Sequence, residues 1–513
     1  MKFSTVLAIS VALSTSAAVP VTQKVFDIDG DVEAMQLAEK PEVDSEQLQQ
    51  LITDEAITLH AEKLYNISKK SIKQYGHPTR VIGSKGHWST IGYILTELKK
   101  LRGFYRVTTQ KFPALFGKIN DYSLLIDGIS AKSVKAFDLT PPTRAEKPVH
   151  GKLAAVANYG CSASDFPAGS VNNIVIIKRG ECAFGAKSIN AGNAGALGAI
   201  IYDASPLAGT LGDHTGQEVA TVSITEKEAQ PYLDKLEADP EAEIEVTLYV
   251  DAKVETVHTL NVVAETVDGD HDNVVALGAH SDSVGAGPGI NDDGSGTISL
   301  LEVAKQLTKF KVNNAVRFAW WAAEEEGLLG SNYYAASLSP EENQKLRVFM
   351  DYDMMASPNY ELQVYNANNE DHPAGSGDLK QLYIDYYVGH GLNYSLTPFD
   401  GRSDYVGFLE TGIPSGGIAT GADEYKTPEE QAKYGGEVKK WLDPCYHQAC
   451  DDLSNPDHAV WLLNTKLIAH SVATYAKSFE GFPKRVPLNE TAATAGVAKA
   501  GVSMKYRGSN LVV

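Results

Sequence analysis

Two histidines and four carboxylates follow one another in the second half of the chain: His280, Asp292, Glu324, Glu325, Asp353 and His447. Neutral imidazole and carboxylate bind zinc well, and a catalytic zinc keeps one position open for water. Two zinc ions that share a bridging carboxylate need two histidines and three carboxylates. We therefore predict a two-zinc hydrolase whose ligands are the residues of this series other than Glu324.

The ligands should divide into distinct roles. Asp292 lies on a short loop between Gly289 and Gly294, where glycines allow a tight turn, and this suits the bridging carboxylate. The neighbours Glu324 and Glu325 cannot both reach one metal from a regular strand. One of them should bind metal while the other serves as general base.

A second layer of residues should orient the ligands. A ligating histidine needs its far ring nitrogen fixed, and Asp282 is a candidate partner for His280. His447 lies between Cys445 and Cys450, so a disulfide across this short loop would hold it rigidly. The two cysteines and His447 could instead form a structural zinc site, although a disulfide is favoured in an exported chain.

The ligands follow predicted buried strands. We predict strands over 273–279, 316–323 and 347–352, which end at His280, at the glutamate pair and at Asp353. Leu300, Val303, Ala304 and Leu307 form one apolar face of a helix between the first two strands. Alternating strands and helices predict an α/β fold with a mixed, centrally parallel sheet flanked by helices. Sites in such sheets form at the carboxyl ends of strands.

The rest of the chain differs in composition. Residues 47–101 have helical periodicity, 105–112 alternate like a strand, and the region up to residue 255 consists of short β-rich runs with glycine-rich turns. We expect these segments: a signal peptide 1–18, a possible propeptide 19–46, a first part of the main domain 47–129, a β-rich insertion 130–255, the metal-bearing main part 256–482 and a mobile tail 483–513.

The chain reads as an exported protein, either secreted or in a vacuolar lumen. Lys2, the apolar residues 6–13 and the small residues 16–18 resemble a secretory signal, and no later apolar stretch is long enough to be a membrane anchor. Four cysteines form two local pairs, Cys161 with Cys182 and Cys445 with Cys450. Glycosylation acceptors occur at Asn66, Asn393 and Asn489.

Several other classes of function are excluded. A net charge of −20 disfavours nucleic acid as a partner. The chain has no His-Glu-x-x-His, so a single-helix metalloprotease is excluded, and no Gly-x-Ser-x-Gly supports a serine nucleophile.

The motifs GAHSDSVGAGPGINDDGSG, AWWAAEEEGLLGS, DYDMMASPN, GRSDY and CYHQACDD resemble those of the co-catalytic zinc aminopeptidases, in particular the fungal aminopeptidase Y and secreted leucine aminopeptidase groups. The resemblance spans most of the mature chain. It implies a zinc exopeptidase fold with two zinc ions per subunit, and identifies the insertion as a protease-associated domain whose paired cysteines would be Cys161 and Cys182.

The resemblance also implies individual roles. His280, Glu325 and the bridging Asp292 would hold zinc on one side or the other, and Asp353 and His447 would complete the pair. Glu324 would be the general base, Tyr446 would stabilise the oxyanion and Arg402 would help to hold substrate near Asp353. Related enzymes often have histidine where this chain has Tyr405, so the preferred side chain of the substrate is not implied.

The substrates implied are peptides with a free N-terminus, and we expect a monomer. Two alternatives stay open at this stage: a glutamate-carboxypeptidase-like zinc exopeptidase, and a receptor-like relative without catalysis.

Overall fold

The computed structural model describes residues 40–101, 103–204, 209–212, 214–239 and 241–486. The expected signal peptide, residues 19–39 of the possible propeptide, and residues 487–513 of the expected tail, with Asn489, lie outside these ranges. In the part of the chain that the structure describes, no helix combines the length and apolarity that a membrane span requires.

The main sheet is mixed and centrally parallel, as predicted. Its strands lie in the order β13 (Ser395–Thr397), β12 (Gln363–Tyr365), β14 (Ser415–Ala419), β11 (Leu346–Tyr352), β9 (Asp270–His280), β10 (Asn314–Trp321) and β8 (Glu245–Thr266). The central strands β14, β11, β9 and β10 are parallel to their neighbours within this group, while β8 and β12 pair antiparallel to it.

Helices cover both faces of this sheet because successive residues of a strand point to opposite sides. In β9, Val275 and Leu277 join the larger hydrophobic core, and Val274 and Ala276 join a second core on the other face. The larger core receives α1 (Ser45–Gln50), α2 (Asp54–Ser68), α4 (Lys85–Lys100), α7 (Gly294–Leu307), α10 (Ser376–Gly389) and α13 (His458–Lys477). The second core receives α8 (Leu329–Ser337) and α11 (Val406–Glu410).

The strand predicted over 105–112 is much longer than expected. It forms β1 (Tyr105–Ile126), which pairs antiparallel with β8 from Tyr105↔Thr266 to Ile126↔Val246. Pro113 interrupts the alternating pattern in the sequence, which hides the continuation. The strand accepts this proline because β1 has no partner on its other side there, and an edge strand need not donate every N–H.

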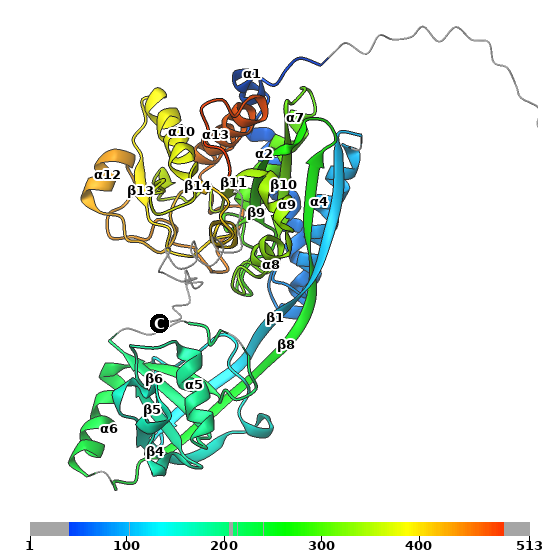
Figure 1. The fold of residues 1–513 in the computed structure, drawn as a ribbon. Coiled ribbons are helices and arrows are strands. Elements are labelled where there is room, and N and C mark those ends of the chain that lie inside the picture. The colour runs from blue at the N-terminus through cyan, green and yellow to red at the C-terminus, as the bar shows by residue number, and fades with distance from the viewer. Residues whose placement is uncertain (1–39, 102, 205–208, 213, 240, 487–513) are drawn as a thin grey trace, which may run out of the picture. The chain divides into compact units, whose positions relative to one another are not determined.

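Strand β8 joins two groups of strands in one continuous order. Near its end it pairs with β10, and near its beginning it pairs with β4 (Val149–Ala155). From β4 a smaller sheet continues through β5 (Ile174–Lys178), β6 (Gly198–Asp203), β7 (Thr221–Thr225) and β3 (Lys135–Ala136). The β1–β8 ribbon thus connects the main domain to the insertion, and the expected boundary at residue 255 falls inside β8 (Figure 1).

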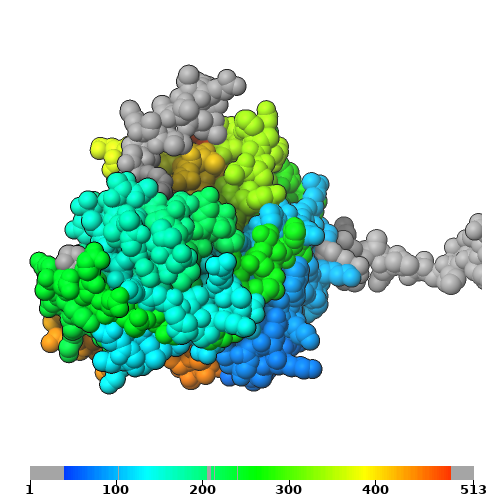
Figure 2. All heavy atoms as spheres, turned by 90° about the horizontal axis from the view of Figure 1, so that it is seen from below, coloured from blue at the N-terminus to red at the C-terminus, as the bar shows by residue number. Residues whose placement is uncertain are grey.

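The insertion has helices of its own, α5 (Phe184–Asn193) and α6 (Glu226–Ala238). In the space-filling view from below, the cyan-to-teal residues that follow β1 and the green residues that precede β8 form one continuous surface (Figure 2). Its apolar core is separate from the main one, and contains Ile174, Ile176, Ile200, Val222 and Leu248.

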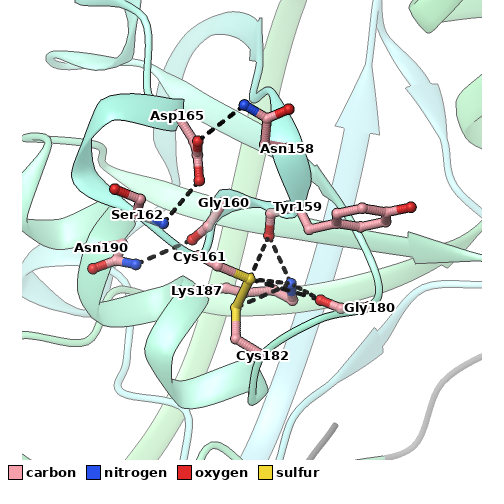
Figure 3. The surroundings of a disulfide bond; sticks show 10 residues. All are labelled: Asn158, Tyr159, Gly160, Cys161, Ser162, Asp165, Gly180, Cys182, Lys187 and Asn190. Carbon is pink, nitrogen blue, oxygen red and sulfur yellow. Dashed lines mark hydrogen bonds between the residues drawn. A yellow bond between two sulfur atoms is a disulfide. The ribbon is translucent and has the colours of Figure 1, made fainter.

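A disulfide joins Cys161 and Cys182 in this insertion, as the sequence predicts. The side chain of Lys187 points at it from α5, and Nζ donates 2.6 Å hydrogen bonds to the carbonyl oxygens of Tyr159 and Gly180 (Figure 3). Burial lowers the pKa of this amine to about 8. The lysine thus fastens together the two loops that the disulfide joins.

Candidate metal centre

Two predicted ligands and the predicted base meet because their strands are neighbours. His280 is the last residue of β9, Asp353 follows β11 directly, and Glu324 comes shortly after β10. These strands lie in the order β11, β9, β10 and are parallel, so their carboxyl ends share one edge of the sheet. The site therefore lies where parallel sheets commonly bind ligands.

The Asp292 carboxylate lies between the two histidines. Oδ1 is 3.2 Å from Nε2 of His280, and Oδ2 is 3.1 Å from Nε2 of His447. The loop before Asp292 turns at Gly289, where φ is +63° and a Cβ atom would come within 2.2 Å of the Asp292 carbonyl oxygen. Only glycine fits there, and Asp292 has the position that a bridging ligand needs.

The remaining carboxylates divide between the histidines. Asp353 Oδ1 is 3.6 Å from Nε2 of His280, whereas Glu325 Oε2 is 3.1 Å from Nε2 of His447. Ligand atoms of His280, Asp292 and Glu325 also lie within 4.8 Å of one another. The 3.1 Å contact between Glu325 and His447 nevertheless favours pairing Glu325 with His447. The sequence left this pairing open.

The two adjacent glutamates diverge, as a strand end allows. Ala323, just before them, has a left-handed φ of +61°, which ends the regular strand geometry. Glu325 uses both oxygens, because Oε1 accepts a 2.9 Å hydrogen bond from the Val284 amide. Glu324 points towards the other histidine, with Oε2 3.8 Å from Nε2 of His280.

Asp282 lies behind these residues and is fully buried. Its Oδ1 is 3.7 Å from Nδ1 of His280, and its two oxygens accept long hydrogen bonds of 3.4 Å from the amides of Glu324 and Glu325. The predicted partner of His280 thus also holds the turn that carries the glutamate pair.

His447 comes from a loop closed by the Cys445–Cys450 disulfide. Because both sulfurs are bonded to each other, these cysteines are not ligands of a structural zinc. His447 has a φ of +57°, and the amide of Gln448 donates to the Cys445 carbonyl at 3.0 Å. The closed loop therefore presents the imidazole to Asp292 and Glu325.

The electrostatics follow from burying acids beside imidazoles. Burial alone lowers the pKa of both histidines, but the surrounding carboxylates outweigh it. Glu324 and Asp353 raise the pKa of His280 well above its usual range, and Glu325 and Asp292 raise the pKa of His447 to about 10. Burial, with Glu325 and Asp353 nearby, also raises the pKa of Glu324. An excess of carboxylates of this kind favours a cation.

Three supporting residues were missed in the sequence. Asp293 accepts hydrogen bonds from the amides of His280, Gly296 and Met354, which ties β9 and β11 to the start of α7. Ser403 contacts Asp353, and Asp451 contacts the loop of Asp292. An aspartate just before a helix is a typical N-cap, so the second aspartate of INDDGSG did carry a signal.

A cavity opens over the cluster. Its lining includes the acidic residues and His447, together with Met354, Gln363, Tyr365, Thr397, Asp400, Arg402, Ala419, Gly421, Ala422, Glu424 and Tyr446. Arg402 Nη2 donates to Asp423 Oδ1 at 2.9 Å and to the Tyr446 hydroxyl at 3.3 Å. The predicted substrate residue Arg402 therefore lies beside the predicted oxyanion residue Tyr446, on the wall of this cavity.

Tyr405 lies behind that wall. It is fully buried, and its hydroxyl accepts a 2.8 Å hydrogen bond from the Gly401 amide and donates at 3.4 Å to Asp400. The residue that departs from the family pattern thus holds the turn that carries Asp400 and Arg402.

The donor set suits zinc. Nε2 of His280 and Oδ1 of Asp353 are buried without a hydrogen-bond partner among the described residues, and they lie 3.6 Å apart. A buried imidazole nitrogen and a buried carboxylate oxygen that are left unpaired are costly, and a bound cation would satisfy both.

Comparison with known proteins agrees with this geometry. The model of peptidase family M28 matches residues 261–472, and the PA domain model matches residues 149–232. Aminopeptidase Y of Saccharomyces cerevisiae is 54% identical over 460 residues, which cover 87% of this chain and 83% of that protein. Leucine aminopeptidase 2 of Trichophyton equinum is 42% identical over 468 residues, which cover 90% of this chain and 92% of that protein.

Solved structures show the same fold. An aminopeptidase from Aneurinibacillus sp. strain AM-1 superposes with a TM-score of 0.69 and 26% identity, covering 87% of this chain and 98% of that one. A zinc aminopeptidase from Bacillus subtilis gives a TM-score of 0.60 at 24% identity, covering 83% and 96%.

Proposed function

Because the chain belongs to peptidase family M28, we propose that its cluster of histidines and carboxylates holds two zinc ions that serve the removal of N-terminal residues from peptides. The chain is a metal-dependent aminopeptidase with an inserted PA domain. This removes the carboxypeptidase-like and receptor-like alternatives.

The contacts of Asp292 carry the proposal. Its two oxygens face different histidines, which is the arrangement a bridge between two ions roughly 3.5–4 Å apart would require. His280 and Asp353 would complete one zinc site, and His447 and Glu325 the other. Zinc at such a site lowers the pKa of water and polarises a carbonyl group.

The protein's own groups would then move the protons. Both glutamates line the cavity, but Glu325 is already engaged by His447 and the Val284 amide. We assign Glu324 as the general base that accepts a proton from the attacking water and returns it to the leaving amine. The Tyr446 hydroxyl would donate to the developing oxyanion, and Arg402 beside it would help to hold the substrate.

The cavity explains why cleavage would begin at an amino terminus. Asp400 and Glu424 line it together with Glu324 and the ligand carboxylates of Asp292, Glu325 and Asp353. A protonated terminal amine is favoured beside these acids, whereas a terminal carboxylate would be repelled. Peptides with a free N-terminus are therefore the proposed substrates, and N-acetylated peptides should not be cleaved.

The test uses Glu324→Gln with the wild-type enzyme beside it. We expect wild-type protein to contain two zinc ions by mass spectrometry of metals, and the variant to keep both while kcat falls by about 10²–10⁴-fold. A variant that retains wild-type turnover with full zinc content would refute the assignment of the base. One zinc ion per active subunit would refute the two-metal site.

The compartment belongs to the proposal as well. Two disulfides and the leader-like sequence at residues 1–18 support a secretory route to a vacuole or the medium. We also propose that the enzyme acts as a monomer. Asn66 and Asn393 are exposed, so both could carry glycans, and an endoglycosidase mass shift would test this.

Val43 is fully buried and Glu42 bridges to Lys311, so we propose that the mature chain begins before these residues. N-terminal sequencing would show this directly.

A further inference from the structure

Arg80 is a buried cation close to the metal centre. Its side chain has no exposed surface, although it comes from the segment before α4. Its Nε donates a 2.8 Å hydrogen bond to the carbonyl oxygen of Pro288, and its two terminal nitrogens donate to the carbonyl oxygens of Ser281 and Gly289. A buried guanidinium is costly unless its donors are satisfied, and here all three acceptors belong to one loop.

That loop, residues 281–289, joins two of the proposed zinc ligands. It starts directly after His280 and ends shortly before Asp292. At Gly289 an added Cβ would lie 3.0 Å from Arg80 Nη2, so the guanidinium fits closely against the backbone turn. At Gly287 a Cβ would lie 2.1 Å from the Gln448 carbonyl oxygen, so the same loop packs against the residue after His447. Movement of this loop would therefore displace three proposed ligands, His280, Asp292 and His447.

A buried aspartate holds the continuation of the loop. The Asp451 carboxylate accepts hydrogen bonds from the amides of Asn291 at 2.9 Å and of Asp292 at 3.0 Å. Arg80 thus binds carbonyl groups before Asp292, and Asp451 binds N–H groups at Asp292. The two side chains come from opposite ends of the chain, so neither contact follows from local sequence.

The charge of Arg80 adds to this geometry. Asp282, Asp293, Asp451 and Asp292 act on it electrostatically. Arginine keeps its proton in proteins, so it provides a permanent positive charge among acids that must be held close together.

We propose that Arg80 is a positioning residue of the metal centre. It fixes the loop between His280 and Asp292 so that both ligands stay at a metal-binding separation, and it thereby strengthens zinc binding. This inference rests on the proposed two-zinc function. It concerns a residue that touches neither substrate nor metal.

The test compares Arg80→Met and Arg80→Lys with Arg485→Met. Arg485 is a matched control, because its guanidinium also donates to main-chain carbonyl groups, those of Asn343 and Leu346, and contacts no proposed ligand. The zinc dissociation constants of each full-length enzyme would be measured by competition with a chromogenic chelator, and the melting temperature by circular dichroism.

We expect Arg80→Met to weaken zinc binding by about 10–100-fold, as residues that orient metal ligands commonly do. Arg80→Lys should lie between this variant and wild type, because an ammonium keeps the charge but cannot reach all three carbonyl groups. Arg485→Met should lower the melting temperature without changing zinc affinity. If Arg80→Met does not fold, Arg80→Lys alone decides the test.

Wild-type zinc affinity in both Arg80 variants would overturn the inference, as would an equal loss of affinity in Arg485→Met. Failure of the proposed function has a different signature, because wild-type enzyme would then not bind two zinc ions. The two failures are thus distinguishable in the same titration.

Discussion

The hydroxyl of Ser403 donates a 3.0 Å hydrogen bond to Oδ2 of Asp353. Ser403 is buried, so water does not compete for this contact. The other oxygen of the carboxylate, Oδ1, faces His280. The serine therefore fixes the rotation of a proposed zinc ligand.

Removing this hydroxyl should weaken metal binding. In Ser403→Ala, Asp353 can rotate away from His280, and we expect zinc affinity at one site to fall by about 10–100-fold. Zinc content after dialysis against graded chelator would measure the loss. Ser403→Thr, which keeps a hydroxyl, is the control. Equal zinc retention in the alanine variant and wild type would contradict this role.

The Cys445–Cys450 disulfide should matter more for the metal than for stability. It closes a loop with a sequence separation of only 5, so its entropic contribution to stability is small. Replacing both cysteines by serine should free the His447 loop and lower zinc affinity. Replacing Cys161 and Cys182 together is the matched control, because that disulfide lies in the insertion. A similar loss of zinc in both double variants would argue against a specific effect.

Tyr405→Phe should change substrate binding rather than chemistry. The lost hydroxyl holds Gly401 and Asp400, so the turn with Arg402 should loosen. We expect KM to rise several-fold while kcat changes by less than about twofold, since no transition-state contact is removed. Tyr387→Phe is the control, because this buried hydroxyl donates to Asn464 in the core. A fall in kcat at constant KM would contradict the prediction.

Acid should release the metal. Neighbouring carboxylates raise the pKa of His280, and raise that of His447 to about 10. Metal binds neutral imidazole, so below these values each histidine must lose a proton to bind it. Apparent zinc affinity should then fall by up to about tenfold per histidine for each unit decrease in pH. Chelator titrations between pH 5 and pH 8 would measure this slope, and a flat profile would contradict it.

His87 should make folding sensitive to acid. Burial lowers its pKa to about 4, and Nδ1 has no hydrogen-bond partner among the described residues. Between the folded pKa and an unfolded pKa of about 6.5, the unfolded chain binds more protons. Stability is therefore present above about pH 6.5 and falls as pH decreases towards 4, by up to about 3 kcal/mol. Urea unfolding of His87→Gln should show a weaker pH dependence than wild type over this window.

The sequence predicts the parts of the site that depend on the residue pattern of a single segment. Buried apolar runs end at His280 and Asp353, and parallel strands bring such ends to one edge of the sheet. It did not reveal that Glu325 faces His447, because that contact depends on where a distant loop folds back. The role of Arg80 could not be predicted for the same reason. Its partners are main-chain carbonyl groups, which every residue type has, so the sequence does not indicate them.

In the fold, the long ribbon was the main omission. Pro113 hid the continuation of β1, and the apolar alternation of β8 breaks at the expected domain boundary, where Val254 is followed by Glu255 and Thr256. The lengths of β1 and β8 are determined by their pairing with each other. Pairing between strands far apart in the sequence is not visible in the local residue pattern of either strand.

The ribbon also constrains the order of events during synthesis. β1 leaves the ribosome before the insertion, but its partner β8 follows only after the insertion is complete. At about 5–20 residues per second, synthesis of the chain from Ile126 to Thr266 takes on the order of ten seconds. During this time the 22-residue strand β1 lacks its partner. Unpaired strands of this kind bind one another readily. The growing chain therefore has a period in which a chaperone would compete with aggregation, and pairing of β1 with β8 ends that period.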